Sequence, residues 1–182
     1  TGVLTLRAIT KDLGTIVVEN LPTVTASNRL LADTDTIAIA LRNIMISTKK
    51  EDREEQIKLI EQARKSSDQW LGELKALMSS GEERTEFDKI AKLRDTYFNG
   101  DKELRNLIFN DTVASARNYL NDELRPTLAA YRTSINAMID RKTRGADESG
   151  KAAQADARTA INALIALGVV ALALAAALGW LI

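Results

Sequence analysis

The sequence contains no cysteine and no histidine. The absence of cysteine excludes a disulfide framework and thiolate chemistry, and the absence of histidine removes the most common general base and metal ligand. These absences argue against most hydrolases and most zinc or copper sites, so we predict no enzyme, no metal site and no cofactor. The 25 basic and 25 acidic side chains balance, so no net positive field favours nucleic acid as a partner.

Aromatic residues make up only 4% of the chain, and there are only two prolines among 182 residues. Alanine, leucine, isoleucine, lysine, glutamate and arginine dominate instead, and these residues favour helix over sheet. The length allows one ordinary domain with a core of its own. The composition therefore predicts an all-α protein.

The C-terminal residues differ in character from the rest of the chain. No charged residue follows Arg158, and residues 164–182 read LIALGVVALALAAALGWLI. About 20 apolar residues cross a bilayer as a helix, and Trp180 would then lie near one interface. The alternative, a core helix of a soluble protein, is rarely apolar on every side. We therefore predict a helical domain over residues 1–159 and a transmembrane helix over residues 160–182.

Residues 1–7 are too short a stretch to cross a membrane and carry a charge at Arg7. They could form the end of a preceding span, but they do not have the pattern of a signal peptide.

The remaining chain divides into four helical segments separated by short polar turns. The expected helices cover residues of about 5–47, 52–78, 85–110, and 111 or 112 onward. Ser79-Ser80-Gly81 should end the second helix, and Thr85-Glu86-Phe87-Asp88, a capping box with Asp in place of Glu, should open the third. Asp111 or Thr112 should cap the fourth. Long amphipathic helices with short connections predict an antiparallel up-down four-helix bundle that continues into the C-terminal transmembrane helix.

Three residues that disfavour helix fall inside these segments. Pro22, after Asn20 and Leu21, should kink the first helix. Gly100 forms a turn-like pair with Asn99, and glycine within a helix costs about 1 kcal/mol relative to alanine. However, the apolar period continues in phase across Gly100 and across Pro126. We therefore expect the third helix to be whole and the fourth to bend rather than break.

Each helix carries a stripe of mostly apolar residues, separated by steps of three and four, which is the pattern of a bundle core. The four stripes are Ser27, Leu30, Thr34, Ile37, Leu41 and Ile44; Ile57, Ile60, Arg64, Ser67, Leu71, Leu74 and Met78; Phe87, Ile90, Arg94, Tyr97, Asp101, Leu104 and Ile108; and Leu120, Leu124, Leu128, Tyr131, Ile135 and Met138.

The polar interruptions of these stripes fall at similar heights in the bundle. At 1.5 Å per residue, they lie within about 10 Å of one level. The residues are Arg94, Tyr97, Tyr131, Arg64 and Thr34. Guanidinium groups bind carboxylates through paired hydrogen bonds, and tyrosine supplies a rigid donor. We therefore predict that these five residues form a binding site for an anion.

A buried arginine requires a negative partner, because leaving it unpaired costs on the order of 3 to 5 kcal/mol. Asp101 lies about 10 Å along the helix axis from Arg94, too far for a direct pair. Asp33 or Asp35 from the first helix, or a small carboxylate from outside, would then neutralise the arginines. The alternative is that the arginines extend their charged ends to solvent and that the tyrosines are ordinary core residues.

Three short stretches and the long fourth helix resemble the periplasmic four-helix-bundle sensor domain of bacterial methyl-accepting chemotaxis receptors. The stretches are Glu19-Asn20-Leu21-Pro22, Asn110-Asp111-Thr112-Val113-Ala114 and Asp122-Glu123-Leu124-Arg125-Pro126. The resemblance covers essentially the whole chain. It implies a homodimer in the bacterial inner membrane, with residues 1–159 as a ligand-sensing domain in the periplasm. It also implies that the span connects to a HAMP module and a cytoplasmic signalling hairpin outside this chain.

Family members that bind organic acids place arginines and polar groups within the bundle, so the resemblance favours a di- or tricarboxylic acid as the ligand. Asp33, Asp35 and Asp101 keep an amino acid open as a second kind of ligand. For the function, a sensor histidine kinase and a structural bundle without ligand also stay open.

Overall fold

The computed structural model describes residues 2–181, and the side chains of all of these except 2–4, 177–179 and 181. Every described element is an α-helix or a π turn, and none of residues 2–181 forms a strand. The chain divides into two compact units, Pro22–Lys142 and a second unit that joins Thr1–Leu21 with Thr143–Ile182.

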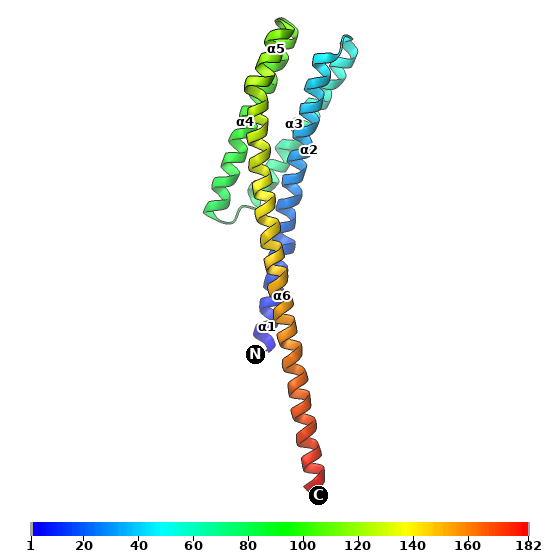
Figure 1. Ribbon diagram of the computed structural model, residues 1–182, viewed down its shortest axis with the longest axis vertical. Helices are drawn as coiled ribbons and strands as arrows, with labels where there is room; N and C mark the ends of the chain where they lie inside the picture. The colour runs from blue at the N-terminus through cyan, green and yellow to red at the C-terminus, as the bar shows by residue number, and fades with distance from the viewer. Residues whose placement is uncertain (1, 182) are drawn as a thin grey trace. The chain divides into compact units, whose positions relative to one another are not determined.

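The unit Pro22–Lys142 is an antiparallel four-helix bundle. Its helices are α2 (Leu21–Ile46), α3 (Lys50–Ala76), α4 (Gly81–Asn110) and the part of α6 (Arg125–Leu181) that ends at Lys142. They lie side by side and alternate in direction (Figure 1), and the short helix α5 (Val113–Tyr119) continues through a π turn into α6. The predicted all-α bundle is therefore confirmed.

Most of the bundle core comes from the predicted apolar stripes. One set of core residues is fully inaccessible to solvent: Leu30, Ile37, Ile44, Ile60, Leu74, Ile90, Leu104, Ile135 and Met138. Burying each such side chain stabilises the fold by roughly 1.5 to 3 kcal/mol. Ile57, Leu71, Ile108, Leu120 and Leu128 are only partly buried at the edge of this core. Alternating steps of three and four thus predicted which face of each helix points inward.

The start of α4 differs from the prediction. The helix begins at Gly81, and Ser80 rather than Thr85 is its cap: the Glu83 N–H donates to Ser80 Oγ at 3.1 Å, and Glu83 Oε2 accepts from the Ser80 N–H at 3.2 Å. Thr85 instead donates to the Gly81 carbonyl inside the helix. Ser80 and Glu83 form a complete capping box, because the glutamate side chain is long enough to reach the Ser80 N–H. The predicted box of Thr85 and Asp88 has the shorter aspartate side chain, and the helix begins at the complete box instead. The predicted cap at Thr112 is confirmed.

A π turn precedes each of the two prolines, and the helix does not break there. η1 (Thr15–Asn20) ends two residues before Pro22, and η2 (Leu120–Leu124) ends two residues before Pro126. The Leu21 and Arg125 N–H groups donate five residues back. Proline in a regular α-helix clashes with the carbonyl four residues earlier, and the wider turn moves that carbonyl away. The helix therefore continues through each proline.

Gly100 lies inside α4, as predicted, and has a packing role. A Cβ atom at this position would lie 2.7 Å from Leu124 Cδ1 and 3.3 Å from the Tyr119 hydroxyl. The absence of a side chain therefore allows η2 and α5 to approach α4 closely.

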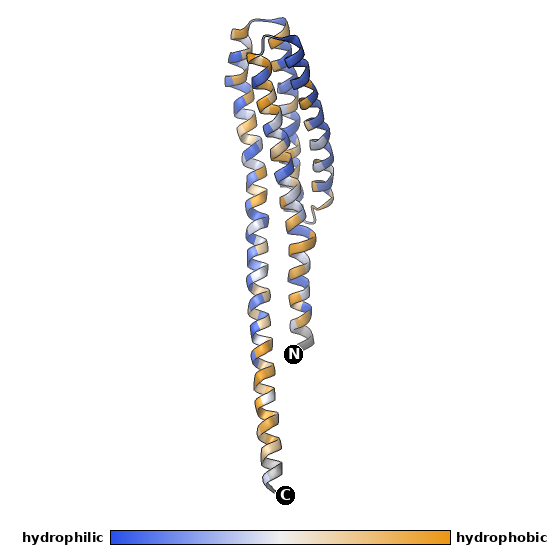
Figure 2. Cartoon of the chain, turned by 90° about the vertical axis from the view of Figure 1, so that its right-hand side faces the viewer, coloured by the Kyte–Doolittle hydropathy of each residue, from blue (hydrophilic) through white to orange (hydrophobic). Residues whose placement is uncertain are grey.

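The second unit contains α1 (Gly2–Gly14), η1 and α6 from Thr143 onward. The helical stretch Val113–Ala176 includes a segment long and apolar enough to cross a membrane, and none of that segment is buried. Figure 2 shows the end of α6 as hydrophobic on its visible side. The candidate transmembrane helix is thus present, whereas the predicted boundary between residues 1–159 and 160–182 stays a prediction.

Candidate functional site

Arg94 lies in the middle of α4 and is only 9% exposed. Its guanidinium donates from Nη2 to Asp68 Oδ1, from Nη1 to Asp95 Oδ1 at 2.9 Å, and from Nε to Ser67 Oγ at 3.4 Å. Because an unpaired buried guanidinium would be strongly destabilising, these partners allow Arg94 to occupy a core position. All three come from α3 and α4.

Arg64 of α3 is paired with Asp101, the carboxylate in the α4 stripe. Arg64 Nη1 donates to Asp101 Oδ2 at 2.6 Å, and Arg105 Nε donates to Asp101 Oδ1 at 2.9 Å. Asp101 itself is fully buried. Burial raises the pKa of Asp101, and the charges of Arg105 and Arg64 lower it in part. The acid in the apolar stripe of α4 is therefore an internal partner for two arginines.

Phe98 brings the two guanidiniums of Arg64 and Arg94 together. The Cζ atoms of Arg64 and Arg94 lie 4.6 Å and 4.2 Å from the centroid of its ring, within the range of cation–π attraction. Phe98 is only 4% exposed, so its position is fixed by packing. Both arginines are thereby held beside one aromatic side chain.

An open groove between α3 and α4 gives solvent access to these arginines. Its volume is about 320 Å³, and its lining residues are Arg64, Asp68, Arg94, Asp95, Phe98 and Asn99. The groove thus presents two guanidiniums, two carboxylates and one aromatic ring. A ligand carboxylate could bind the guanidiniums here if it displaced the acidic partners.

Tyr97, Tyr131 and Thr34 lie in the bundle core, each 1% exposed or less. The two tyrosine ring centroids are 6.3 Å apart, and Thr34 Oγ1 donates to the Leu30 carbonyl at 2.6 Å. Neither tyrosine hydroxyl has a hydrogen-bond partner of ordinary geometry among the described residues. Two buried donors are thus available in the core.

The pKa of both tyrosines is raised because burial removes water from the hydroxyl. For Tyr131 the pKa rises to about 12, although the neighbouring Ser67 and Thr34 hydroxyls and the Arg94 charge oppose the rise. For Tyr97, the negative charge of Asp101 adds to the effect of burial on the pKa. Both side chains are therefore neutral hydrogen-bond donors at physiological pH.

The five predicted site residues thus form two adjacent groups. Arg64 and Arg94 line the groove, whereas Tyr97, Tyr131 and Thr34 are enclosed in the core. Ser67 connects the groups, because it accepts from Arg94 and lies beside the Tyr131 hydroxyl. The role of these residues in ligand binding stays a prediction.

The prediction that Asp33 or Asp35 of the first helix neutralises the arginines is wrong, because Asp101, Asp68 and Asp95 pair with them. Asp35 pairs with Arg132 of α6, and Asp33 lies beside Ser66 and Arg29. Some of these pairs have a signal in the sequence: Asp95 is next to Arg94, and Asp101 precedes Arg105 by four residues. Phe98 was also missed, although it follows Arg94 by four residues and therefore lies on the same helix face.

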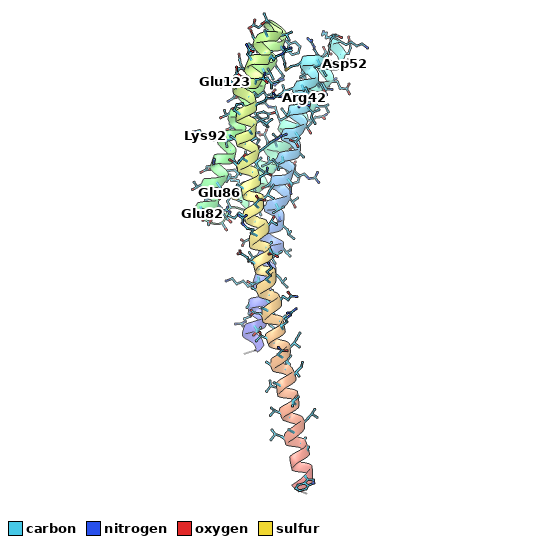
Figure 3. The ribbon with its side chains drawn as sticks, viewed as in Figure 1. Arg42, Asp52, Glu82, Glu86, Lys92 and Glu123 are labelled. Carbon is cyan, nitrogen blue, oxygen red and sulfur yellow. The ribbon has the colours of Figure 1, made fainter. Side chains whose placement is uncertain are left out.

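Tyr97 also lines a smaller cavity of about 60 Å³ between α2, α4 and α6. Four leucines line it, and the exposed side chains of Arg42 and Arg125 also contribute to its lining. Figure 3 labels Arg42 on α2. Within residues 2–181, no group of three or more acidic side chains is placed to hold a metal ion.

Residues 1–157 match the family described as the four helix bundle sensory module for signal transduction. No curated protein matches the chain.

Proposed function

Because this chain belongs to the four-helix-bundle sensory modules of signal transduction, we propose that it is the sensor of a methyl-accepting chemotaxis receptor. It binds a small carboxylate, such as a di- or tricarboxylic acid, in the groove between α3 and α4. Binding then alters α6, which continues into the apolar segment. The family is a sensory module rather than a family of enzymes, and the proposed role requires no catalysis.

The pairing of Arg94 supports a carboxylate ligand. The carboxyl-bearing side chains that neutralise it, Asp68 and Asp95, are 66% and 68% exposed. Exposed ion pairs contribute only about 0 to 1 kcal/mol, because solvent screens them and both side chains must be ordered. A carboxylate that bonds the guanidinium through two parallel hydrogen bonds can replace them at small cost. Arg94 is therefore the primary anion acceptor in this proposal.

Arg64 supplies the second positive charge. Its partner Asp101 is fully buried, so solvent does not weaken this pair and Arg64 keeps its position when a ligand displaces the exposed partners of Arg94. A second carboxyl group of the ligand would approach this fixed charge. Two guanidiniums beside one aromatic ring favour an acid with at least two carboxyl groups.

Tyr131, Tyr97 and Thr34 act as the inner wall of the site. Movement of Arg94 toward a ligand weakens its contact with Ser67, and the Ser67 hydroxyl can then strengthen its interaction with the neighbouring Tyr131 hydroxyl of α6. Tyr97 packs against Tyr131 and extends the change toward α2. Ligand binding in the groove is thereby coupled to α6.

The proposed setting is the inner membrane of a bacterium, with the bundle in the periplasm and a homodimer as the active form. A shift of α6 by about 1 to 2 Å would suffice to change the state of a cytoplasmic signalling module outside this chain. A sensor histidine kinase would use the bundle in the same way. A structural bundle without ligand predicts no stabilisation by any small acid.

The proposal is tested by thermal unfolding of the full chain in detergent with succinate, malate, citrate and, for comparison, aspartate and serine. A ligand that binds only the folded state at 100 times its Kd stabilises it by about 2.7 kcal/mol, which raises Tm. Arg94→Ala should abolish the rise, Tyr131→Phe should reduce it, and Arg132→Ala, which removes a surface pair with Asp35, should leave it unchanged. An equal rise in all four proteins would contradict the assigned site.

A further inference from the structure

Two consecutive cations of α6 hold the first turns of α4. Arg141 Nη2 lies 2.6 Å from Glu86 Oε2, and Arg141 Nη1 lies 3.8 Å from Glu82 Oε1. Lys142 Nζ donates to Glu83 Oε1 at 2.5 Å. Figure 3 shows Glu82 and Glu86 at the end of α4 that lies beside α6. We call these five residues the clasp.

The centre of the clasp is buried. The side chains of Lys142 and Glu83 are only 7% and 13% exposed. A lysine usually extends its ammonium group to water, so a buried one indicates a fixed partner. Lys142 thus differs from Lys151 of the same helix, whose side chain is 73% exposed and pairs only with Asp147 on α6 itself.

Glu83 connects three segments through its two carboxylate oxygens. Oε1 accepts from Lys142 of α6, whereas Oε2 accepts from the Ser79 N–H at 2.9 Å and from the Ser80 N–H at 3.2 Å. The same residue closes the capping box of α4. A displacement of Lys142 along the axis of α6 therefore breaks a bond to a carboxylate that the turn holds in place.

Apolar contacts between helices tolerate small sliding movements, whereas a buried ion pair has one favourable arrangement. Buried pairs contribute little net stability compared with hydrophobic residues of similar size, and fixing a register is their best supported role. The ion pair of Arg132 with Asp35 also joins α6 to a neighbouring helix, but its two side chains are 41% and 53% exposed, so it holds the register less firmly.

We propose that the clasp fixes the axial position of α6 against α4 and that its opening is the step that allows α6 to shift. Arg141 and Lys142 are thus positioning residues for signal transmission, separate from the residues that bind the ligand. The link to transmission rests on the proposed function, in which α6 carries the signal.

The test measures the distance between α4 and α6 in the full chain in lipid nanodiscs without any ligand. Because the chain has no cysteine, spin labels can be placed on cysteines at the exposed positions Lys92 and Asn136. Double electron–electron resonance then gives the distance distribution for the parent and for Lys142→Met, Glu83→Gln, their double variant and Lys151→Met. Glutamine preserves the capping box, so Glu83→Gln removes the charge but not the cap.

We expect Lys142→Met and Glu83→Gln to shift the mean distance by about 1 to 2 Å or to broaden the distribution by that amount. The double variant should regain the Tm of the parent, because no buried charge is left unpaired, and still show the altered distribution. Lys151→Met should match the parent. A double variant that folds and gives the distribution of the parent would overturn the clasp, whatever the outcome with carboxylates.

Discussion

At the scale of single residues, the two groove arginines differ in how firmly their charges are neutralised. Arg64 pairs with a fully buried carboxylate, whereas the acids that pair with Arg94 are largely exposed. Water and ions screen the exposed pairs but not the buried one. An incoming anion therefore competes for Arg94, and the pair between Arg64 and Asp101 belongs to the permanent structure.

This difference predicts that the free energy of unfolding depends strongly on Asp101 and only weakly on Asp95. Asp101→Asn leaves Arg64 and Arg105 without a shared counter-charge, so the free energy of unfolding should fall by about 3 to 5 kcal/mol. Asp95→Asn removes only an exposed partner and should change it by less than about 1 kcal/mol. Urea unfolding followed by circular dichroism measures both. Equal effects of the two substitutions would contradict the permanent role of Asp101.

The lowered pKa of Glu83 makes the free energy of unfolding depend on pH. Burial alone would raise its pKa, but hydrogen bonds from Lys142, Ser79 and Ser80 lower it from 4.5 to about 2. A carboxyl group whose pKa is lower in the folded state stabilises the fold above its unfolded pKa, and this contribution is lost as the pH falls. The stability advantage of the parent over Glu83→Gln should therefore be complete above about pH 5 and decline between pH 4.5 and 2. If the difference in unfolding free energy between the parent and Glu83→Gln did not change with pH, the ionised Glu83 carboxylate would not be stabilised by the clasp.

At the scale of helices, the two glycines Gly72 and Gly100 are a matched pair. Both lie within long helices, but a Cβ atom at Gly72 would meet no atom within 4 Å, whereas one at Gly100 would lie 2.7 Å from Leu124 Cδ1. Leu124 is itself buried, so it has little room to move. The same substitution should therefore affect stability differently at the two positions.

Gly72→Ala should stabilise the protein by about 1 kcal/mol, because alanine is the better helix former. Gly100→Ala gains the same propensity but overpacks the contact with η2, which costs about 1 to 3 kcal/mol, so its net effect should be neutral to destabilising. Thermal unfolding of both variants measures the difference. A rise in Tm at both positions would show that α4 and η2 are not in close contact.

The helices show what the sequence could predict. Stripes such as Leu30-Thr34-Ile37 and Ile90-Arg94-Tyr97 identified the buried faces, because the period of a helix fixes which residues point the same way. Phe98 escaped this pattern, since it lies beside Tyr97 and is buried against arginines rather than in the central stripe. Asp68 escaped it as well, because the rotation of α3 relative to α4 decides which acid of α3 reaches the Arg94 guanidinium. The π turns before Pro22 and Pro126 could not be predicted either, because the clash of a proline with the carbonyl four residues earlier can be relieved by a kink or by a wider turn.

At the scale of the whole molecule, the apolar end of α6 should place the chain in a membrane. Its large side chains are exposed on all sides: Ile161, Leu164, Ile165, Leu167, Val169, Val170, Leu172, Leu174 and Trp180. A helical segment of this length with no polar face is stable in lipid and not in water.

The full chain should therefore remain with membranes after an alkaline carbonate wash. A chain that ends at residue 159 should appear in the soluble fraction with the helix content of the bundle, because the core of Pro22–Lys142 contains none of the removed residues. Immunoblotting of the two fractions measures the distribution. A full chain released by the wash would contradict the membrane assignment.

Binding of a carboxylate at Arg94 is measured most directly by isothermal titration of the parent and of Arg94→Lys with the acid that stabilises the protein most. Lysine keeps the charge but lacks the planar fork that bonds both carboxylate oxygens. We predict that Arg94→Lys weakens binding at least about tenfold, a loss of about 1.4 kcal/mol, at unchanged helix content. Equal Kd values for the two proteins would show that the ligand does not bind this guanidinium.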